Sequence, residues 1–571
     1  MSTTDKGPPP DTRKGKVTGA EAIARFLQDT GVELIFGYPG GAVIPLYDAL
    51  YGSPVRHVLC RHEQGAAHAA DGYARASGRT GVVIATSGPG ATNLVTGLAN
   101  AHMDSVPMVA ITGQVSTTSI GTDSFQEADI YGITIPITKY NYLVKDPADL
   151  LGDLAEAFHL ASSGRPGPVL VDVPKDIQTA EIPYLLPPNP AIPGYDPRPR
   201  ASAAEVDALA EAIARSLRPV FYVGGGAVST GVSEEIRKLA VGSDVAVATS
   251  LLAKGVFPDD HGLSLGLPGM HGAKYANLAI NESDLIIGLG VRFDDRVVGD
   301  VRRFAPLARI AHVDVDPAEI GKRLSVDLPV TGDLKLVLDM LIERHSPSPK
   351  PEWRTRVAEL KRGHPLAVPE SGGSRVKPQA LIRAVSDLTA GKAVIVTDVG
   401  QHQMWAAQLI ESSEPRRFLS SGGLGTMGFG LPAAMGAAMS CPGVPTVLIA
   451  GDGGFQMNIQ ELATVRENSV PLKMIVSNNG CLGMVRQWQQ FFFDKRYSST
   501  VFGFNPDFAR IAGAYGIPAE RVEDPARVLD AVRELIASDG PGLLDVIVDP
   551  EENVLPMIPA GKGQTDFFGE G

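Results

Sequence analysis

The sequence has 571 residues, of which 44% are hydrophobic and 20% are charged, and its formal net charge is −13. This composition is typical of a globular enzyme with several domains and ample core-forming material. The acidic balance and the lack of a Lys/Arg block argue against a nucleic-acid partner. No apolar run approaches the ~18 residues that a membrane span needs.

Three cysteines, Cys60, Cys441 and Cys481, lie far apart and form no CxxC pair. This spacing argues against a disulfide framework or a zinc site and favours a reducing compartment. Residues 1–16 are polar and rich in proline and glycine, without the apolar core of a secretory signal. We therefore predict a disordered tail over 1–16 and a cytoplasmic protein.

Three blocks follow, in which short apolar runs alternate with helix-like segments, as in parallel sheets wrapped by helices. The first block, 17–185, has expected strands and helices that can be given by residue number. The strands are 33–36, 55–60, 82–86, 106–111 and 169–173, and the helices are 18–30 and 65–77. A proline-rich surface linker, 186–200, comes next, because so many prolines do not fit a packed sheet.

The second block, 201–345, begins with an expected helix at 203–217 and a strand at 219–223. Further strands are expected at 285–289 and 310–315. A second linker, 346–376, contains a short helical piece. The third block, 377–550, has expected strands at 393–397, 446–450, 473–477 and 544–548, and residues 551–571 form either a disordered end or a lid. The predicted fold is α/β, with three doubly wound domains and mostly parallel sheets.

The sharpest local signal is Gly451-Asp452-Gly453 followed by Asn478-Asn479, with Asp452 and Asn479 twenty-seven positions apart. A strand, a helix over about 455–467 and a second strand separate them. A right-handed crossover then brings both polar residues to one carboxyl edge, where open parallel sheets bind ligands. A carboxylate with an amide oxygen suits Mg²⁺, and the glycines let the backbone approach a diphosphate. An ordinary strand-end turn is the alternative that this joint spacing disfavours.

Glu63 lies where an expected strand meets an expected helix, in the segment RHEQGA. The GDG and NN pattern resembles the thiamine-diphosphate motif. In such a site, a carboxyl group at residue 63 can hydrogen-bond a ring nitrogen of thiamine and favour the tautomer that removes the thiazolium proton. Taken alone, Glu63 is explained equally well by a favourable charge at a helix N-terminus. His62 and His68 are better explained as core residues.

The GDG and NN pair is the thiamine-diphosphate motif, and six further segments stand in the order and spacing of acetohydroxyacid (acetolactate) synthases. These are FGYPGGAV (36–43), RHEQGA (61–66), TSGPGATN (86–93), GTDSFQEAD (121–129), GGLGTMGFGLPAA (422–434) and GMVRQWQ (483–489). The sequence resembles this family from about Val17 to Val548. The resemblance implies a transferase that decarboxylates pyruvate on thiamine diphosphate. It joins the hydroxyethyl group to pyruvate or 2-oxobutyrate, the first common step of branched-chain amino-acid biosynthesis.

The resemblance also implies the residues that surround thiamine diphosphate. It gives catalytic roles to Glu63, Gln126 and Gly41. Cofactor contacts fall on Pro89, Asn93, Gly400, Gln401, His402, Gly425, Met427, Gly453 and Gly454, and the metal ligands are Asp452, Asn479 and the backbone carbonyl of Cys481. Gly425 would accept a hydrogen bond from the exocyclic amine, and Met427 would force the folded shape of the cofactor. Cys481 departs from the family pattern, in which many relatives carry a larger or acidic residue. As a thiol, it is a candidate site of oxidation.

The second block is the better candidate for a dinucleotide, because its expected strands end in glycine turns and acidic residues. A plain α/β spacer domain is the alternative. The resemblance implies FAD here, held by Gly224, Gly225, Gly226, Met270, His271, Gly272, Arg292, Asp295, Asp314 and Asp333. The implied reaction has no net redox change, so this FAD would be largely structural.

For the acceptor substrate, the resemblance points to Arg296 as the cation that binds its carboxylate, since an arginine fork suits that geometry. Val485 and Trp488 would contact its alkyl group. The alternatives are an ion pair of Arg296 with a neighbouring aspartate and an aromatic core around Trp488. Sites of the family form between two subunits, so a homodimer or homotetramer is expected. The sequence leaves open whether a small regulatory subunit binds.

Other functions compete with this interpretation. A pyruvate oxidase and a flavin-free catabolic acetolactate synthase share the fold, but RFDDR (292–296) and RQWQ (486–489) argue against both. A glyoxylate carboligase would lack Glu63. A non-catalytic scaffold should have lost Glu63 or a metal ligand, and a dehydrogenase would depend on the GxGxxG segment 423–428, which is a weak signal alone.

Overall fold

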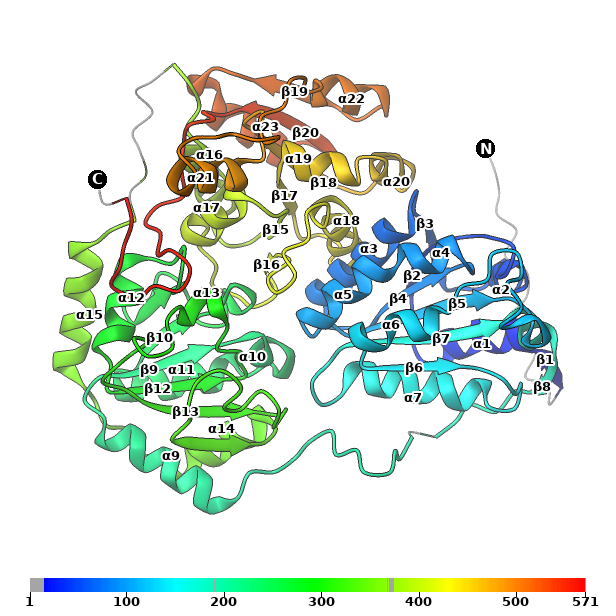
Figure 1. Ribbon diagram of the computed structural model, residues 1–571, viewed down its shortest axis with the longest axis horizontal. Helices are drawn as coiled ribbons and strands as arrows, with labels where there is room; N and C mark the ends of the chain where they lie inside the picture. The colour runs from blue at the N-terminus through cyan, green and yellow to red at the C-terminus, as the bar shows by residue number, and fades with distance from the viewer. Residues whose placement is uncertain (1–14, 189, 367, 369–373, 570–571) are drawn as a thin grey trace.

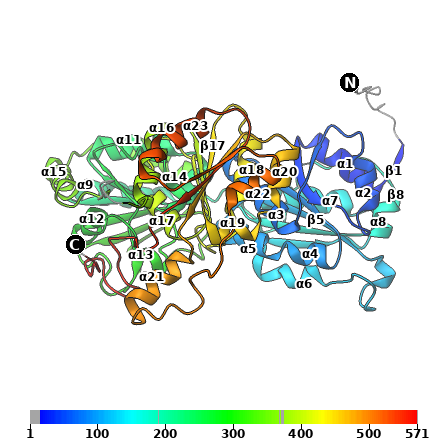
Figure 2. The same ribbon diagram turned by 90° about the horizontal axis from the view of Figure 1, so that it is seen from above.

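The computed structural model of the protein describes residues 15–188, 190–366, 368 and 374–569. Within these ranges three domains are each built on a six-stranded sheet flanked by helices (Figure 1). Every strand pair inside the three sheets is parallel. The predicted α/β fold is therefore confirmed. The second view shows the first domain at one end of an elongated molecule and the other two together at the opposite end (Figure 2).

The sheet of the first domain has the order β3-β2-β4-β5-β7-β6. Its strands are β2 (Leu34–Tyr38), β3 (Arg56–Leu59), β4 (Gly81–Ala85), β5 (Met108–Gln114), β6 (Tyr140–Leu143) and β7 (Pro168–Pro174). Its helices are α1 (Gly19–Asp29), α2 (Ile44–Leu50), α3 (Glu63–Ser77), α4 (Pro89–Asn93), α5 (Val95–Met103), α6 (Ile130–Thr134), α7 (Leu150–Ser162) and α8 (Lys175–Thr179). Strands β4 and β5 are buried along their whole length, as apolar runs in the middle of a parallel sheet should be.

The third domain repeats this spatial order with its own strands, β16-β15-β17-β18-β20-β19. They are β15 (Val394–Thr397), β16 (Phe418–Leu419), β17 (Thr446–Gly451), β18 (Leu472–Asn478), β19 (Ala519–Val522) and β20 (Gly542–Ile547). Its helices are α16 (Pro378–Thr389), α17 (Gln401–Leu409), α18 (Gly430–Ser440), α19 (Asp452–Met457), α20 (Glu461–Glu467), α21 (Gly483–Phe492), α22 (Phe508–Ala514) and α23 (Val528–Ala537). The two outer domains thus share one topology.

The middle domain has a different order, β11-β10-β9-β12-β13-β14, which reverses direction between β9 and β12. Its strands are β9 (Pro219–Val223), β10 (Ala246–Thr249), β11 (Ser264–Gly266), β12 (Leu285–Leu289), β13 (Arg309–Asp314) and β14 (Leu328–Thr331). Its helices are α9 (Ala203–Arg215), α10 (Gly225–Thr230), α11 (Ser233–Ser243), α12 (Lys274–Glu282), α13 (Asp295–Val298), α14 (Leu334–Arg344) and α15 (Pro351–Gly363). Sheets of this order bind dinucleotides at the carboxyl edge where the order reverses.

The segments between the domains differ in part from expectation. Of the expected tail 1–16, residues 1–14 lie outside the described residues, and Lys16 already begins β1 (Lys16–Thr18), which pairs with β8 (Glu181–Pro183). The expected linker 346–376 contains α15, which packs on the middle domain through the buried Trp353. Its indole Nε1 donates to the Pro219 carbonyl at 3.0 Å, so this helix extends the middle domain.

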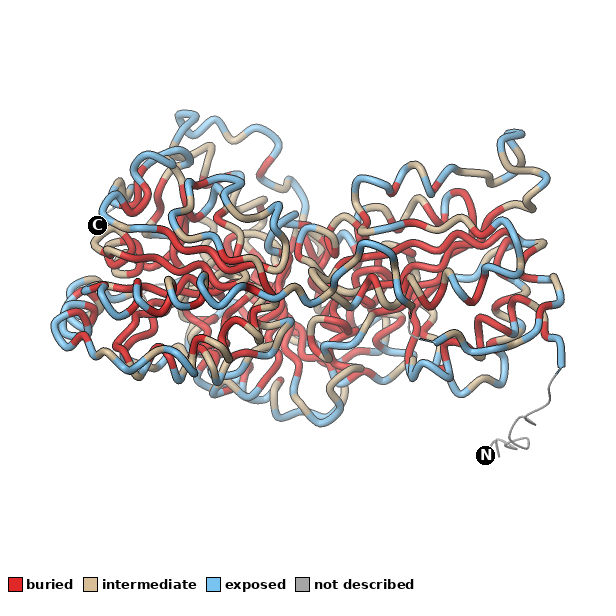
Figure 3. The backbone as a smooth tube through the Cα atoms, turned by 90° about the horizontal axis from the view of Figure 1, so that it is seen from below, coloured by how far each residue is buried: buried red, intermediate tan, exposed pale blue. Residues whose placement is uncertain are grey.

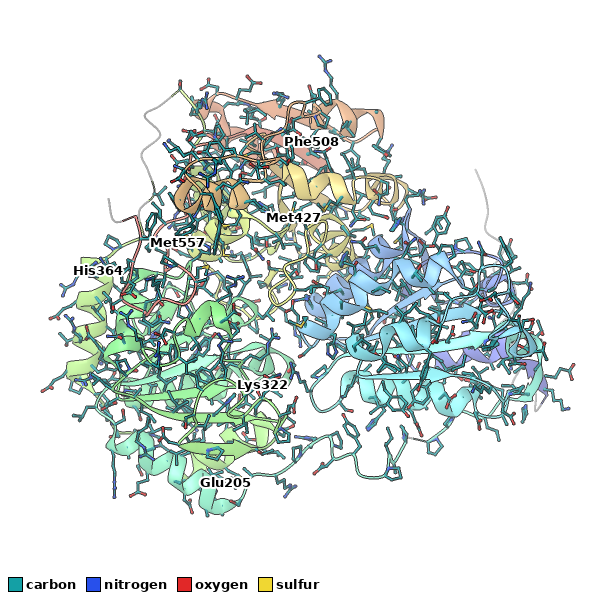
Figure 4. All side chains as sticks on the ribbon, in the orientation of Figure 1. Glu205, Lys322, His364, Met427, Phe508 and Met557 are labelled. Atoms are coloured by element: carbon teal, nitrogen blue, oxygen red, sulfur yellow. The ribbon has the colours of Figure 1, made fainter. Side chains whose placement is uncertain are left out.

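The described part of the C-terminal tail, 551–569, crosses from the third domain to the middle domain. The Arg486 guanidinium of α21 donates to Asn553 at 2.9 Å, and the Ile558 amide donates to the Met270 carbonyl at 2.8 Å. Met557 is buried at this junction (Figure 4). These contacts contradict a disordered end for 551–569 and agree with the alternative of a cover.

One predicted helix is interrupted. The sequence favoured a single helix over about 455–467, whereas the structure has α19 and α20 with a break at 458–460. At the break the Asn458 side chain donates to the Gly428 carbonyl at 2.7 Å, and the Glu461 carboxylate accepts from two backbone amides of the first domain. These long-range hydrogen bonds override the helical pattern.

Helices α3 and α18 join the first and third domains at backbone distance. A Cβ added to Gly72 would lie 2.0 Å from the Ala433 carbonyl oxygen, and one added to Gly436 would lie 1.9 Å from that of Ala69. Residues of both helices belong to one hydrophobic cluster, and the buried backbone runs through this junction in Figure 3. Within the described ranges, no helix is long and apolar enough to cross a membrane.

We predict that Gly72→Ala destabilises the protein by at least about 1–3 kcal/mol, because the new methyl group overpacks a backbone contact. Thermal melting measures the effect. The matched control is Gly152→Ala in α7, where an added Cβ meets nothing within 4 Å. There we expect a gain of about 0.5–1 kcal/mol from helix propensity. A Gly72→Ala protein as stable as the wild type would contradict the close packing of α3 and α18.

Candidate functional site

A cavity lies at the carboxyl edge of the third sheet, and Asp452 and Asn479 of the GDG and NN motif both line it. Strands β17 and β18 pair in parallel with Gly451 opposite Ser477, so Asp452 and Asn479 leave the sheet side by side. The crossover predicted from their spacing is therefore confirmed. Every residue that lines this cavity lies between Val399 and Val485. They are Val399, Gly400, Gln401, His402, Trp405, Met427, Gly451, Asp452, Gly453, Gly454, Ser477, Asn479, Cys481, Leu482, Gly483, Met484 and Val485.

Two hydrogen bonds from neighbouring residues orient the buried Asp452 carboxylate. It is 1% exposed and accepts hydrogen bonds from the Gly480 amide at 2.9 Å and from Asn505 Nδ2 at 2.7 Å. Burial raises the pKa of Asp452 to about 6. Asn505 also donates to Asn478, at 2.8 Å, and sequence reasoning missed it because it lies on a later loop. The described residues contain no cluster of three His, Cys, Asp or Glu side chains that could bind a metal. An aspartate, an amide oxygen and backbone carbonyls fit a hard cation that keeps phosphate or water ligands.

The other side of the cavity fits an anion. His402 is buried, and its Nε2 has no hydrogen-bond partner among the described residues. Burial lowers the pKa of His402 to about 4, so the imidazole is neutral at pH 7 and can present an N–H to a ligand. Glycine at residue 451 leaves room for this ring, since a Cβ there would make a tight contact of 3.0 Å with His402 Nδ1. Gln401 also lines the cavity, and its amide links α21 and the tail by donating to Gln487 and to the Glu552 carbonyl, both at 2.9 Å.

Asp398, which the sequence analysis did not single out, fixes the loop of Gly425 and Met427. Its buried carboxylate accepts from the amides of Gly428 and Gly430, at 3.1 and 2.8 Å. A Cβ on Gly454 would lie 2.2 Å from the Asp398 carboxylate, so that glycine has a packing reason as well. The available signal was its position, directly after an apolar strand, as for Asp452. Met427 lies on the part of the third domain that faces the centre of the molecule (Figure 4).

Glu63 forms a separate group in the first domain. It begins α3, is 9% exposed and accepts a hydrogen bond from Asn93 Nδ2 at 2.9 Å. Pro89 and Asn93 bound the short helix α4, so these three predicted residues lie together. Gln126 has a left-handed backbone, with φ of 59°, and packs its backbone against Gly88. Gly41 is exposed in the turn after β2.

The structure does not bring Glu63 into the cavity of Asp452 within one chain. All the residues that line that cavity come from the third domain. Helix α3, which begins at Glu63, packs instead on α18 of the third domain. The two predicted halves of the thiamine site are therefore separate in a single copy.

A second cavity lies at the switch point between β9 and β12, as the strand order predicts. Six of the expected FAD residues line it, namely Gly224, Gly225, Gly226, Arg292, Asp314 and Asp333. Burial raises the pKa of Asp314 to about 6. Of the other four, Met270 and Asp295 line a smaller cavity beside the tail, and His271 and Gly272 line neither.

The walls of the switch-point cavity come from all three domains. Met103, Asp104 and Arg165 belong to the first domain, and Gly422 and Gly423 belong to the third. Arg165 pairs with two acidic residues of the middle domain, Asp316 at 3.0 Å and Glu319 at 2.8 Å. Sequence reasoning missed these residues, because no local pattern links residue 165 to residue 316.

The three residues expected at the acceptor site are not gathered in one cavity. The Arg296 side chain is 61% exposed and only loosely paired with Asp295, at 3.8 Å. Val485 lines the cavity of Asp452, whereas Arg296 lines the one beside the tail. Trp488 is half-buried, and its ring lies 5.4 Å from that of the exposed Phe492, which does not fit the core alternative.

The Cys481 thiol differs from the expectation of an oxidation-sensitive group. It is 4% exposed, and burial raises its pKa to about 11. Since the thiolate is the reactive form, this environment protects the sulfur at neutral pH. Its amide donates to Asn479 Oδ1 at 3.1 Å, so the residue stays next to the expected metal ligand.

Comparisons with known proteins agree with this arrangement. Three family models match in sequence: the thiamine pyrophosphate enzyme N-terminal TPP binding domain at residues 17–133, the central domain at 206–341 and the C-terminal TPP binding domain at 398–546. Similar proteins include an acetolactate synthase large subunit of Mycobacterium tuberculosis, 50% identical over 97% of this chain and 91% of its own length.

Two further relatives carry related names. They are the acetolactate synthase large subunit of Corynebacterium glutamicum (49% identical, 97% of this chain, 90% of its own) and the probable acetolactate synthase large subunit of Methanocaldococcus jannaschii (48%, 96% and 95%). The chain belongs to the thiamine pyrophosphate enzyme family, in the group of the acetolactate synthase large subunits. The resemblance seen in the motifs is confirmed, and the two TPP binding domains support the expected thiamine diphosphate.

We predict that Cys481 in the folded protein reacts with iodoacetamide far more slowly than the partly exposed Cys441. A pKa raised from 9.0 to about 11 lowers the thiolate fraction about 100-fold below pH 9, and burial slows access further. Peptide mass spectrometry after timed labelling measures both sites. Labelling of Cys481 as fast as that of Cys441 would show that the thiol is open to solvent.

Proposed function

We propose that the protein is the catalytic subunit of an acetolactate synthase. It decarboxylates pyruvate and joins the two-carbon unit to pyruvate or 2-oxobutyrate, as the first common step of branched-chain amino-acid biosynthesis. The observation that carries this proposal is the cavity at β17 and β18, where Asp452 and Asn479 lie beside the unpartnered His402 Nε2. Identity of about half over nearly the full length supports the same activity.

In the proposed site, Asp452, Asn479 and the backbone carbonyl of Cys481 would hold Mg²⁺, which would supply positive charge for the diphosphate of thiamine diphosphate. His402, Gly400, Gln401, Gly453 and Gly454 surround that diphosphate. Bound thiamine diphosphate supplies the electron sink for the fragment that remains when CO₂ leaves. Gly425 accepts from the aminopyrimidine, and Met427 supports the bend of the cofactor. Asp398 and Asn505 keep these groups in place.

Glu63 holds a proton at the ring nitrogen of the aminopyrimidine, with Asn93 orienting its carboxyl group. Pro89 packs beside this ring, and Gln126 and Gly41 contact the reacting groups. Arg296 binds the carboxylate of the acceptor oxo acid, and Val485 and Trp488 contact its alkyl group. The exposure of Arg296 fits a site that the substrate and a second chain complete.

The active assembly is a homodimer or a homotetramer in which each site combines Glu63 of one chain with Asp452 of another. The separation of these residues in a single copy supports this arrangement. The relatives are named large subunits, which supports a small regulatory subunit as a further partner. We propose a cytoplasmic location on the basis of this biosynthetic role.

The switch-point cavity of the middle domain would hold FAD, with Asp314 available to the ribose or base and Gly224, Gly225 and Gly226 available to the phosphates. Because condensation of two oxo acids has no net redox change, the flavin stabilises the arrangement of the domains. The cavity walls from all three domains support this role. Gly422 and Gly423 lie three and two residues before Gly425, so bound FAD would also support the loop at the thiamine ring.

With pyruvate, thiamine diphosphate, Mg²⁺ and FAD, we expect the wild-type protein to form acetolactate. Glu63→Gln should lower the rate about 10²–10⁴-fold, because the amide cannot exchange the proton. The control is Glu33→Gln, which only breaks an exposed ion pair with Arg79. Acetolactate formation follows the reaction. Consumption of pyruvate without acetolactate would instead favour an oxidase or a decarboxylase.

We expect the purified protein to show a resolved flavin absorption spectrum. Asp314→Ala should weaken FAD binding about 10-fold or more, because a hydrogen bond from a ribose hydroxyl to a carboxylate is lost. Flavin absorbance after gel filtration measures retention. Asp339→Ala, on the outer side of α14, is the control and should keep its flavin. Acetolactate formation by a flavin-free wild-type protein would contradict the proposed role of FAD.

A further inference from the structure

The turn that precedes Glu63 is held by a buried carboxylate of the third domain. Glu461, near the start of α20, is 0% exposed. Its Oε1 accepts from the Arg61 amide at 2.9 Å and from the His62 amide at 3.1 Å. Its Oε2 accepts from the Thr464 hydroxyl at 2.7 Å. The carboxylate therefore binds the two peptide units immediately before Glu63.

These hydrogen bonds fix the direction in which Glu63 leaves the turn. Without Glu461, two backbone amides at a half-buried turn would lose their acceptor, which is costly. His62 is also the N-cap of α3, where its Nδ1 accepts from the Gln64 amide at 3.2 Å. The turn is thus set by hydrogen bonds on both sides of Glu63, and the stronger acceptor comes from another domain.

The first domain leaves space for this carboxylate by having glycine at residue 65. A Cβ there would lie 2.5 Å from Glu461 Oε1. Gly65 has no left-handed backbone and lies within α3, so its φ does not require glycine. The close approach of Glu461 is therefore the feature that favours glycine at residue 65. Burial raises the pKa of Glu461, while hydrogen bonds from Thr464, Arg61 and His62 favour the charged form.

We infer that Glu461 is a positioning residue, which orients the activating Glu63 by holding the backbone of Arg61 and His62. The inference rests on the proposed role of Glu63 toward thiamine diphosphate. In the described residues, Glu461 does not line the cofactor cavity and forms no hydrogen bond with the Glu63 side chain. Its effect reaches the reaction through the turn alone. Small displacements of a catalytic group are known to cost about 100-fold in rate.

A neighbouring contact separates this role from general adhesion between the domains. The Arg61 guanidinium pairs with Glu467 of the same helix α20 at 2.8 Å, on the surface. This pair joins the same two segments but leaves the backbone amides untouched. Glu467 is therefore the matched control for Glu461.

The test compares Glu461→Leu, Glu461→Gln and Glu467→Leu with the wild type, each loaded with thiamine diphosphate and Mg²⁺ and without substrate. The first readout is the rate at which the thiazolium carbon of the cofactor exchanges its proton for deuterium. For Glu461→Leu we expect a loss of at least about 10-fold. Amide exchange in the peptide around Arg61 and His62 should rise. The dissociation constant of the cofactor should change little.

Glu461→Gln keeps an oxygen acceptor for the two amides and should retain most of the thiazolium exchange rate. Glu467→Leu should match the wild type. If Glu461→Leu does not fold, Gly65→Ala decides, since its methyl group displaces the carboxylate while it favours the helix. That variant should fold and show the same slow exchange.

Wild-type rates in folded Glu461→Leu or in Gly65→Ala would overturn the inference. Equal losses in Glu461→Leu and Glu467→Leu would also overturn it, because they would indicate adhesion between the domains. A wild-type protein that does not accelerate thiazolium exchange would show that the proposed function fails, and the inference with it.

Discussion

The backbone contact between α3 and α18 is the constraint on which the rest of the structure depends. Because residues 72 and 436 are glycines, the two helices pack at backbone distance. This close packing limits how far one helix can slide along the other. Helix α3 begins at Glu63, and α18 follows the loop of Gly425 and Met427. One packing contact therefore sets the starts of both helices, and each start belongs to a segment that we assign to the thiamine site.

The same contact explains why the site is divided. With α3 packed on α18, Glu63 lies across the domain junction from Asp452, whose cavity is lined only by the third domain. In a single copy, the carboxylate that we propose as the activator, Glu63, does not line the cavity that we propose for the diphosphate. Two copies, arranged so that each supplies the missing half, satisfy both. The middle domain adds its cavity at the junction, with Asp104 and Gly423 among the walls.

Much of the fold and part of the candidate site could be predicted from the sequence, because they depend on local patterns. Apolar runs identified most of the central strands, although edge strands such as β6, β14 and β19 were not predicted. The spacing of Asp452 and Asn479 correctly placed both at one sheet edge. What the sequence could not show are the long-range polar contacts. Glu461 binds a backbone amide 400 positions away, and such bonds also break the helix predicted over 455–467. Arg165 could not be predicted for the same reason, because its two acidic partners lie about 150 positions later in the chain. Asp398 is the exception, since its place after a strand was a usable signal.

The central claim is that one active site combines the third domain of one chain with the first domain of another. A crystal structure of the protein with thiamine diphosphate and Mg²⁺ tests it most directly. We expect a diphosphate and a metal at Asp452 and Asn479, and a pyrimidine ring within hydrogen-bond distance of the Glu63 carboxylate of a second copy. A pyrimidine bound to Glu63 of the same chain, or a cofactor away from Asp452, would contradict it.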